Sequence, residues 1–287
     1  MKVEKVIRKT MKIRPSGRST DFISPSFGHG CLYNCTYCYM KRHKAEGLDI
    51  ATNTGDILTE INNHSWFTTV DKPNQTHPEL ITYDISCNED FALHAKYHNW
   101  KKIFDFFKFH PLAMGSFATK YVNRDLLEYN SDRKIRIRFS LMPETWRQTL
   151  EPDTSPTIER IMAINDFIEA GYDVHVNFSP VIVEDTWLKR YEKLFKLLDE
   201  NVKDEHKDKV KAEVIFLTHN AEKHDYNLQN NLPGEDLLWK PEMQETKISQ
   251  YGGENLRYKH NLKSKLIEEW KKLHREIIPW NTVRYIF

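Results

Sequence analysis

Cysteine is scarce in this sequence, with only four among 287 residues. That count excludes a secreted disulfide scaffold, which is dense in cysteine. No apolar stretch approaches the roughly 18 residues of a membrane-spanning helix, and the charged first residues contain no apolar signal-peptide core. We therefore expect a cytoplasmic protein without a membrane partner. Lysine and arginine total 42 against 41 aspartates and glutamates, which excludes nucleic-acid binding driven by bulk charge alone.

The positive charge that is present is concentrated at the N-terminus. Residues 1–18 contain seven lysines and arginines and a single glutamate. Such a run can be an arm that contacts phosphates or a solvated tail, and the sequence leaves both interpretations open. We assign residues 1–20 to a basic N-terminal segment.

Repeats, low-complexity tracts and a linker rich in glycine, proline or serine are also absent. Instead, β-rich runs alternate with helical stretches, which predicts βαβ units around a parallel sheet. The β-rich runs lie at 22–28, 81–87, 114–120, 135–141, 174–181 and 212–218. About six units are too few for an eight-stranded barrel. We therefore predict an α/β fold, a partial (β/α)6 TIM-like barrel over residues 21–218.

The remaining residues, 219–287, form the predicted C-terminal extension. They begin with a polar stretch, 219–260, and continue into an amphipathic helix expected near residues 262–276. We expect this extension to cover the active site of the barrel.

Three of the four cysteines, Cys31, Cys35 and Cys38, lie within eight residues just after the first predicted strand. This spacing points to a metal or redox cofactor because the thiols of a cytoplasmic chain stay reduced. A 4Fe–4S cluster normally takes four cysteines, so three leave one iron open to a small molecule, as a catalytic cluster requires. Zinc is the alternative, since His43 could complete a four-ligand site.

The Cys-x3-Cys-x2-Cys loop resembles the signature of the radical S-adenosylmethionine (AdoMet) superfamily, in which an aromatic residue, here Tyr37, precedes the third cysteine. Beyond the loop, the sequence resembles the spore photoproduct lyase family from about Ser24 to the C-terminus. The matching stretches are 30–39, 87–90, 119–121, 136–140, 170–181 and 251–252.

The resemblance implies a role for particular residues. Cys31, Cys35 and Cys38 would ligate a 4Fe–4S cluster whose open iron binds AdoMet. Cys87 would return a hydrogen atom to the product radical, assisted by Tyr39. The residues implied to contact AdoMet are Tyr37, Asp90, Lys120, Ser140 and Ser179, and those implied to contact the substrate are Tyr251 and Arg257.

The activity implied is that of a radical AdoMet lyase that cleaves a methylene-linked thymine dimer in DNA through a 5′-deoxyadenosyl radical. Its partners would be DNA carrying the thymine photoproduct and an external electron donor such as flavodoxin or ferredoxin. Gln250 stands where the family commonly has arginine, which favours a first alternative: the same radical chemistry on another nucleobase, a small molecule or a peptide. A second alternative is a zinc-stabilised nucleic-acid-binding module without catalysis.

Overall fold

A computed structural model describes residues 2–44, 46–248 and 253–287 of the chain. The chain divides into two compact units. Unit 1 comprises Met1–Leu32, His43–Phe139 and Ala163–His175, and unit 2 comprises Tyr33–Arg42, Ser140–Met162 and Val176–Phe287. Among the described residues, no helix combines the length and the apolar character that a membrane span requires.

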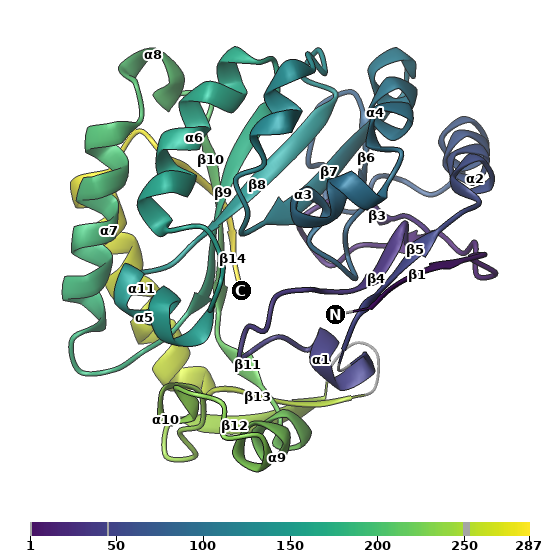
Figure 1. Ribbon diagram of the computed structural model, residues 1–287. Helices are drawn as coiled ribbons and strands as arrows, with labels where there is room; N and C mark the ends of the chain where they lie inside the picture. Colours follow the sequence, from purple (N-terminus) through teal and green to yellow (C-terminus); the bar gives the residue numbers. More distant parts are fainter. Residues whose placement is uncertain (1, 45, 249–252) are drawn as a thin grey trace. The chain divides into compact units, whose positions relative to one another are not determined.

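The largest sheet has eight strands in the order β14-β10-β9-β8-β7-β6-β3-β2 (Figure 1). Their bounds are β2 Arg14–Pro15, β3 Phe22–Ile23, β6 Ile81–Asp84, β7 Ala113–Thr119, β8 Ile135–Leu141, β9 Asp173–Val181, β10 Lys211–Phe216 and β14 Thr282–Ile286. All six strands expected from the sequence are present, which confirms the α/β prediction. The pairs β3–β6, β6–β7 and β7–β8 are parallel, as βαβ units require.

The two outer strands of this sheet were not predicted. In unit 1, β2 pairs antiparallel with β3, and in unit 2 the C-terminal β14 pairs parallel with β10. Two three-stranded sheets contain the other strands of the described residues. Sheet β1-β5-β4 belongs to unit 1 and sheet β11-β13-β12 to unit 2. Their strands are β1 Val3–Val6, β4 Gly28–Gly30, β5 Leu48–Ala51, β11 Thr218–His219, β12 Gln244–Ile248 and β13 Glu254–Tyr258.

The helices follow the strands as the alternating pattern predicts. They are α1 Met40–His43, α2 Thr54–Phe67, α3 Phe91–His94, α4 Trp100–Phe109, α5 Glu144–Leu150, α6 Thr157–Glu169, α7 Trp187–Asn201, α8 Asp204–Lys207, α9 Ala221–Gln229, α10 Glu235–Leu238 and α11 His260–Ile277. Helix α11 confirms the amphipathic helix expected near 262–276. It lies alongside α7 (Figure 1), and its buried Trp270 packs against Phe195 of α7 with ring centroids 5.2 Å apart.

Strand β8 shows how polar residues are accommodated in a buried strand. All seven of its residues are buried, including two arginines. In unit 1, Arg136 pairs with Asp173 at 2.7 Å, and Arg138 pairs with Asp84 at 2.7 Å. Each buried guanidinium therefore has a carboxylate partner, without which its burial would be strongly unfavourable.

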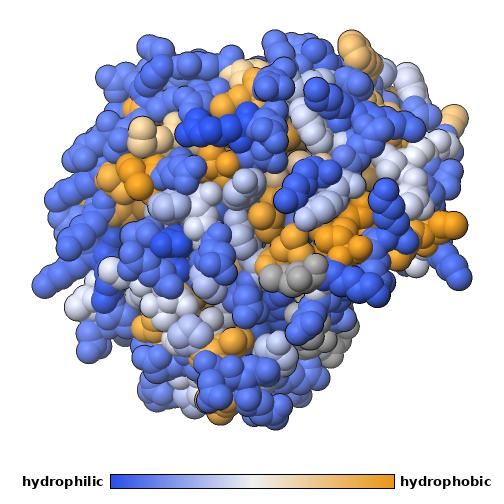
Figure 2. Space-filling view, viewed as in Figure 1, coloured by the Kyte–Doolittle hydropathy of each residue, from blue (hydrophilic) through white to orange (hydrophobic). Residues whose placement is uncertain are grey.

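The face drawn in Figure 2 is mainly hydrophilic, with apolar residues in separate groups.

Candidate functional site

The cysteine loop leaves strand β4 through a glycine. Gly30 has a φ of +107°, and a Cβ atom there would lie 2.5 Å from the carbonyl oxygen of Gly47, so no other residue fits without strain. The Gly30 N–H donates to the carbonyl oxygen of Asn88 at 3.0 Å. This hydrogen bond joins the residue before Cys31 to the residue after Cys87. The structure thus brings the start of the cysteine loop and the segment of the fourth cysteine together within unit 1.

A buried carboxylate with two histidines supports the same part of the loop. Glu89 Oε2 accepts from His94 Nδ1 and from His98 Nε2, each at 2.9 Å. His94 Nε2 in turn accepts the Leu32 N–H at 3.3 Å. All three side chains are almost fully buried. The Glu89 carboxyl packs against Gly28, where a Cβ atom would approach it to 2.4 Å. This cluster therefore fixes the backbone beside Cys31.

Glu89 should contribute to stability only while it is ionised. Burial raises the pKa of Glu89, but the charge of His98 and the hydrogen bonds from His94 and His98 outweigh burial and hold the pKa at about 2. The unfolded carboxyl has the ordinary value of 4.5. Because the folded pKa is depressed, the stabilisation is complete above pH 4.5 and disappears as the pH falls toward 2, a difference on the order of 3 kcal/mol.

We therefore expect Glu89→Gln to destabilise unit 1 at pH 6 and to have a much smaller effect near pH 3. Urea unfolding of both proteins at a series of pH values measures this difference. Glu60→Gln, on the surface helix α2, is the matched control. A Glu89→Gln deficit that stays constant from pH 6 to pH 3 would contradict the assignment.

Asp90 organises the end of strand β7. Its Oδ1 accepts from the Thr119 hydroxyl at 2.6 Å and its Oδ2 accepts the Lys120 N–H at 2.8 Å. Oδ1 also accepts the Leu93 N–H at 3.2 Å and so caps helix α3. Asp90 and Lys120, both proposed from sequence as AdoMet contacts, are thus adjacent. Lys120 directly follows β7, the strand end at which β/α barrels place functional side chains.

The second half of the cysteine loop is held in unit 2. The Thr36 N–H donates to the Leu150 carbonyl at 2.9 Å. The Tyr37 hydroxyl donates to Glu151, and burial followed by the Glu151 charge raises the pKa of Tyr37 well above its usual value. Glu151 is paired with Arg160 at 2.9 Å.

Arg160 continues this chain of contacts to strand β8. It donates to the Ser140 carbonyl at 2.8 Å, and both it and Glu151 are fully buried. Hydrogen bonds and an ion pair therefore connect Tyr37 through Glu151 and Arg160 to Ser140. Sequence reasoning missed Glu151 and Arg160 because a buried ion pair has no spacing signature.

Removal of Glu151 should destabilise unit 2 severely. Glu151→Leu leaves the Arg160 guanidinium buried without its counter-charge, and breaking such a pair costs about 3–5 kcal/mol. Thermal or urea unfolding measures the loss. Glu192→Leu, which removes an exposed partner of Lys196, is the control and should change the midpoint little. Equal effects of the two substitutions would contradict the role given to Glu151.

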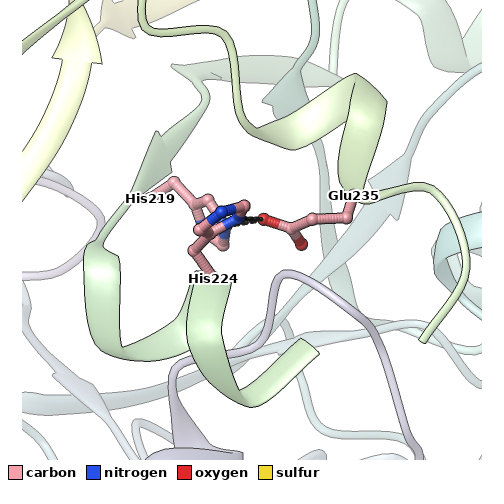
Figure 3. A group of neighbouring side chains, drawn as sticks. All are labelled: His219, His224 and Glu235. Atoms are coloured by element: carbon pink, nitrogen blue, oxygen red, sulfur yellow. Dashed lines mark hydrogen bonds and ion pairs between the residues drawn. The ribbon is translucent and has the colours of Figure 1, made fainter. Parts of the chain in front are cut away.

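A second polar cluster in unit 2 was also missed by sequence reasoning. His219 on β11 and His224 on α9 both point toward Glu235 at the start of α10 (Figure 3). His219 Nε2 and His224 Nδ1 donate to the same oxygen, Glu235 Oε1, at 2.8 and 2.6 Å. Asn227 donates to the other carboxylate oxygen and, at 3.2 Å, to the carbonyl of Thr36, which lies between Cys35 and Cys38.

Comparison with known proteins decides the family. The model of the spore photoproduct lyase family matches residues 3–287. The chain belongs to the spore photoproduct lyase family. It is 29% identical over 197 residues to spore photoproduct lyase of Bacillus subtilis (strain 168), and 26% identical over 196 residues to that of Geobacillus sp. (strain Y412MC61). Each match covers 67% of this chain and 55% of the relative, so the chain aligns with only about half the length of these curated relatives.

Solved structures show the same fold. A spore photoproduct lyase mutant with bound AdoMet and dinucleoside spore photoproduct has a TM-score of 0.88 at 20% identity, covering 99% of this chain and 82% of that one. Spore photoproduct lyase complexed with dinucleoside spore photoproduct also has a TM-score of 0.88, at 22% identity and the same coverage. The partial TIM-like barrel predicted from sequence is therefore confirmed.

The other residues implied by the spore photoproduct lyase family lie on several elements. Ser179 is half-buried on β9, and Tyr39 is 44% exposed just before α1. Arg257 on β13 lies over the ring of Phe287, with the guanidinium carbon 4.6 Å from the centroid. Tyr251 and Gln250 lie outside the described residues. The roles given to these residues stay predictions.

A signal for one missed cluster was present in the sequence. His94 and His98 are four residues apart, directly after the Cys87 segment, a spacing that places two side chains on one face of a helical turn. The residues of the second cluster, His219, His224 and Glu235, lie on three different elements, and no periodicity connects them.

Proposed function

We propose that this chain is a radical AdoMet lyase that cleaves a methylene-linked thymine dimer in DNA. Membership in the spore photoproduct lyase family supports the proposal. The structural observation that carries it is the hydrogen bond from Gly30 to Asn88, at 3.0 Å, because this bond holds the Cys87 segment beside the cysteine loop. A fourth thiol held beside this loop would serve as a hydrogen-atom donor in such a reaction.

Cys31, Cys35 and Cys38 would hold the 4Fe–4S cluster. The residues present fit this group: none of the four cysteines forms a disulfide, and thiolates are the ligands that iron–sulfur clusters require. Lys223 is a second feature that suits a negatively charged cluster. Its buried ammonium group has no hydrogen-bond partner among the described residues, and the charges of Cys38 and Cys35 act on it. When bound and reduced, the cluster supplies the electron that splits AdoMet into methionine and a 5′-deoxyadenosyl radical.

The protein's own contribution to cofactor binding would come from the ends of successive strands. Lys120 after β7 would offer an ammonium group, and Ser140 on β8 and Ser179 on β9 would offer polar groups to AdoMet. Asp90 holds the Lys120 N–H at 2.8 Å, which fixes the backbone from which this lysine projects. The aromatic ring of Tyr37, anchored through its hydroxyl to Glu151, would lie against the adenine.

Cys87 would complete the reaction by hydrogen-atom transfer. After the dimer linkage breaks, a thymine carbon radical remains. Transfer of the Cys87 S–H hydrogen to that carbon forms a C–H bond and leaves a thiyl radical, so atoms and electrons balance. A thiol suits this role because its S–H bond is weaker than the C–H bond formed. Tyr39, near the end of the same loop, would assist.

The proposed partners are DNA containing the thymine photoproduct and a flavodoxin or ferredoxin as electron donor. The lesion has to leave the base stack to reach an enzyme site, and an already distorted base makes this less costly. Tyr251 and Arg257 of the C-terminal extension would contact the substrate there. The basic residues 1–20 offer charge for DNA phosphates.

Anaerobic reconstitution followed by product analysis tests this function. The protein is supplied with iron, sulfide, AdoMet and dithionite, and then with the dinucleoside thymine photoproduct. Release of 5′-deoxyadenosine together with repaired thymine is expected. If 5′-deoxyadenosine forms but the dimer is untouched, the substrate is another nucleobase, small molecule or peptide, the outcome that Gln250 would explain.

Loss of either polar AdoMet contact should weaken cofactor binding. Hydrogen bonds to charged groups contribute about 1.5–3 kcal/mol, so Lys120→Ala is expected to raise the AdoMet dissociation constant at least about tenfold, and Ser140→Ala by a smaller factor. Iron content should not change. Equilibrium binding of AdoMet to the reconstituted protein measures both, with exposed Lys101→Ala as control. Unchanged affinity in Lys120→Ala would remove that residue from the proposed site.

A further inference from the structure

Helix α9 presents two polar side chains on one face. The helix begins at Ala221 after Asn220, whose side chain caps it by accepting the Lys223 N–H at 2.8 Å. Lys223 and Asn227 are four residues apart, so they occupy neighbouring positions on the same face. Both side chains are buried, at 1% and 0% exposure. Burial of an ammonium and an amide on one helix face indicates a specific polar environment opposite them.

That environment is the cysteine loop. Asn227 donates to the Thr36 carbonyl at 3.2 Å, which places this face of α9 against the segment between Cys35 and Cys38. The charged groups that act on Lys223 support this placement of the helix face. Burial lowers the pKa of Lys223, and the charge of Lys41 lowers it further, whereas negative charge on Cys38, Glu235 and Cys35 acts in the opposite direction. Because Lys223 lies one helical turn before Asn227 on the same buried face, its ammonium is directed toward the same loop, and the charges of Cys38 and Cys35 act on it.

Glu235 and the two histidines hold this arrangement in place. Burial raises the pKa of the Glu235 carboxyl, and the hydrogen bonds that it accepts lower the pKa by more, so the group is ionised. His224 is also stacked on Trp239 with ring centroids 3.9 Å apart. The cluster fixes Asn227 through the carboxylate and supplies one negative charge near Lys223.

The same three side chains have the composition of a metal site, yet their geometry favours hydrogen bonds. The nitrogen-to-oxygen separations are 2.8 and 2.6 Å, whereas bonds of 2.0–2.1 Å in a tetrahedral zinc site place ligand atoms about 3.3 Å apart. A divalent cation there would also lie near the buried Lys223 ammonium, which repels it. We therefore interpret the cluster as a support for α9.

Contacts within the protein do not account for the burial of the Lys223 ammonium group. Among the described residues, no hydrogen-bond partner contacts its Nζ atom. The flat face of Tyr226 lies 4.6 Å away, which offsets only part of the loss of hydration. A buried ammonium without an adequate partner is costly, so a strong negative charge opposite it is expected. An iron–sulfur cluster on thiolates carries a net negative charge that increases by one on reduction.

We propose that Lys223 is a positioning residue for the radical chemistry: its ammonium lies beside the Cys35 and Cys38 side of the 4Fe–4S cluster and raises the reduction potential of that cluster. A positive charge there stabilises the reduced cluster more than the oxidised one, and nearby charge is one of the factors that set such potentials. The inference rests on the proposed cluster. It assigns to unit 2 a part in electron transfer to the cofactor.

The test is the midpoint potential of the cluster in Lys223→Met, which keeps an unbranched side chain only one atom shorter and removes the charge. Wild-type, Lys223→Met and Lys223→Arg proteins are reconstituted anaerobically and titrated with dithionite while the reduced cluster is followed by electron paramagnetic resonance. At a fixed potential, Lys223→Met should hold about tenfold less reduced cluster, equal to about 59 mV for a one-electron couple. Lys223→Arg should recover part of the shift. Exposed Lys196→Met is the matched control.

A stability measurement separates this role from a structural one. Without the cluster, Lys223→Met should be at least as stable as wild type because an unpaired buried charge has been removed. A structural lysine would instead give a less stable apoprotein and an unchanged potential, which overturns the inference. Weaker AdoMet binding with an unchanged potential would also overturn it, since the ammonium would then face the cofactor carboxylate.

The outcomes also separate this inference from the proposed function. If wild-type protein binds no iron, the proposed cofactor fails and Lys223 has no cluster to act on. If wild type holds the cluster and Lys223→Met has the wild-type potential, only the role of Lys223 fails.

Discussion

Cys35→Ala is expected to abolish cofactor cleavage completely. Wild-type protein should bind about four irons and four sulfides per chain, as a 4Fe–4S cluster requires. Cys35 is 5% exposed, and its carbonyl accepts the Cys38 N–H at 3.0 Å, so this thiol is held in a tight turn inside the loop. Its loss leaves two thiolates for a cluster that needs three. Iron and sulfide analysis, the visible absorption near 400 nm and 5′-deoxyadenosine release should all fall to background.

The control for this experiment is Cys87→Ala, which removes a thiol outside the loop and should retain iron. Anaerobically purified wild-type protein that carries one zinc ion and no iron would refute the cluster and would revive the zinc-binding alternative with His43 as a ligand. Full 5′-deoxyadenosine release by Cys35→Ala would show that this cysteine is not a ligand.

Cys87→Ala is expected to change the products of the reaction while its first half continues. The substituted protein should keep its cluster and still form 5′-deoxyadenosine, because Cys87 is proposed to act after the first hydrogen abstraction. The thymine radical would then lack its hydrogen donor. Clean thymine should therefore be replaced largely by adducts with dithionite-derived species or solvent components, which chromatography with mass spectrometry identifies.

If Cys87 only packs in the fold and donates no hydrogen atom, the opposite result is expected. Cysteine and alanine differ little in volume, so the substitution would cause modest destabilisation and leave the products unchanged. The same thymine product at the wild-type rate in Cys87→Ala would rule out hydrogen donation. A matched comparison with Asn88→Ala, which keeps the carbonyl that binds Gly30 and alters only the neighbouring side chain, shows whether disturbance of the segment alone changes the products.

The barrel strands could be predicted because parallel strands buried on both sides are rich in apolar and β-branched residues. Strand β9, Asp173–Val181, lies within one residue of the range expected. Strand β14, Thr282–Ile286, was missed because its pairing with β10 joins segments about 70 residues apart, and no local pattern encodes such a partner.

In the candidate site, the difference between what the sequence predicts and what only the tertiary structure shows is larger. Sequence alone identified the family and predicted the three loop cysteines and Cys87 as site residues, because residue type and short spacing are typical of thiolate chemistry. Only the tertiary structure showed that Glu89 and its histidines hold the loop at Leu32, and that Glu151 and Arg160 link Tyr37 to Ser140. The same holds for Lys223, which follows Cys38 by 185 residues in the sequence but lies on the face of α9 that Asn227 holds against the cysteine loop. Burial and charge pairing depend on which distant segments fold together, and spacing along a chain contains no record of that.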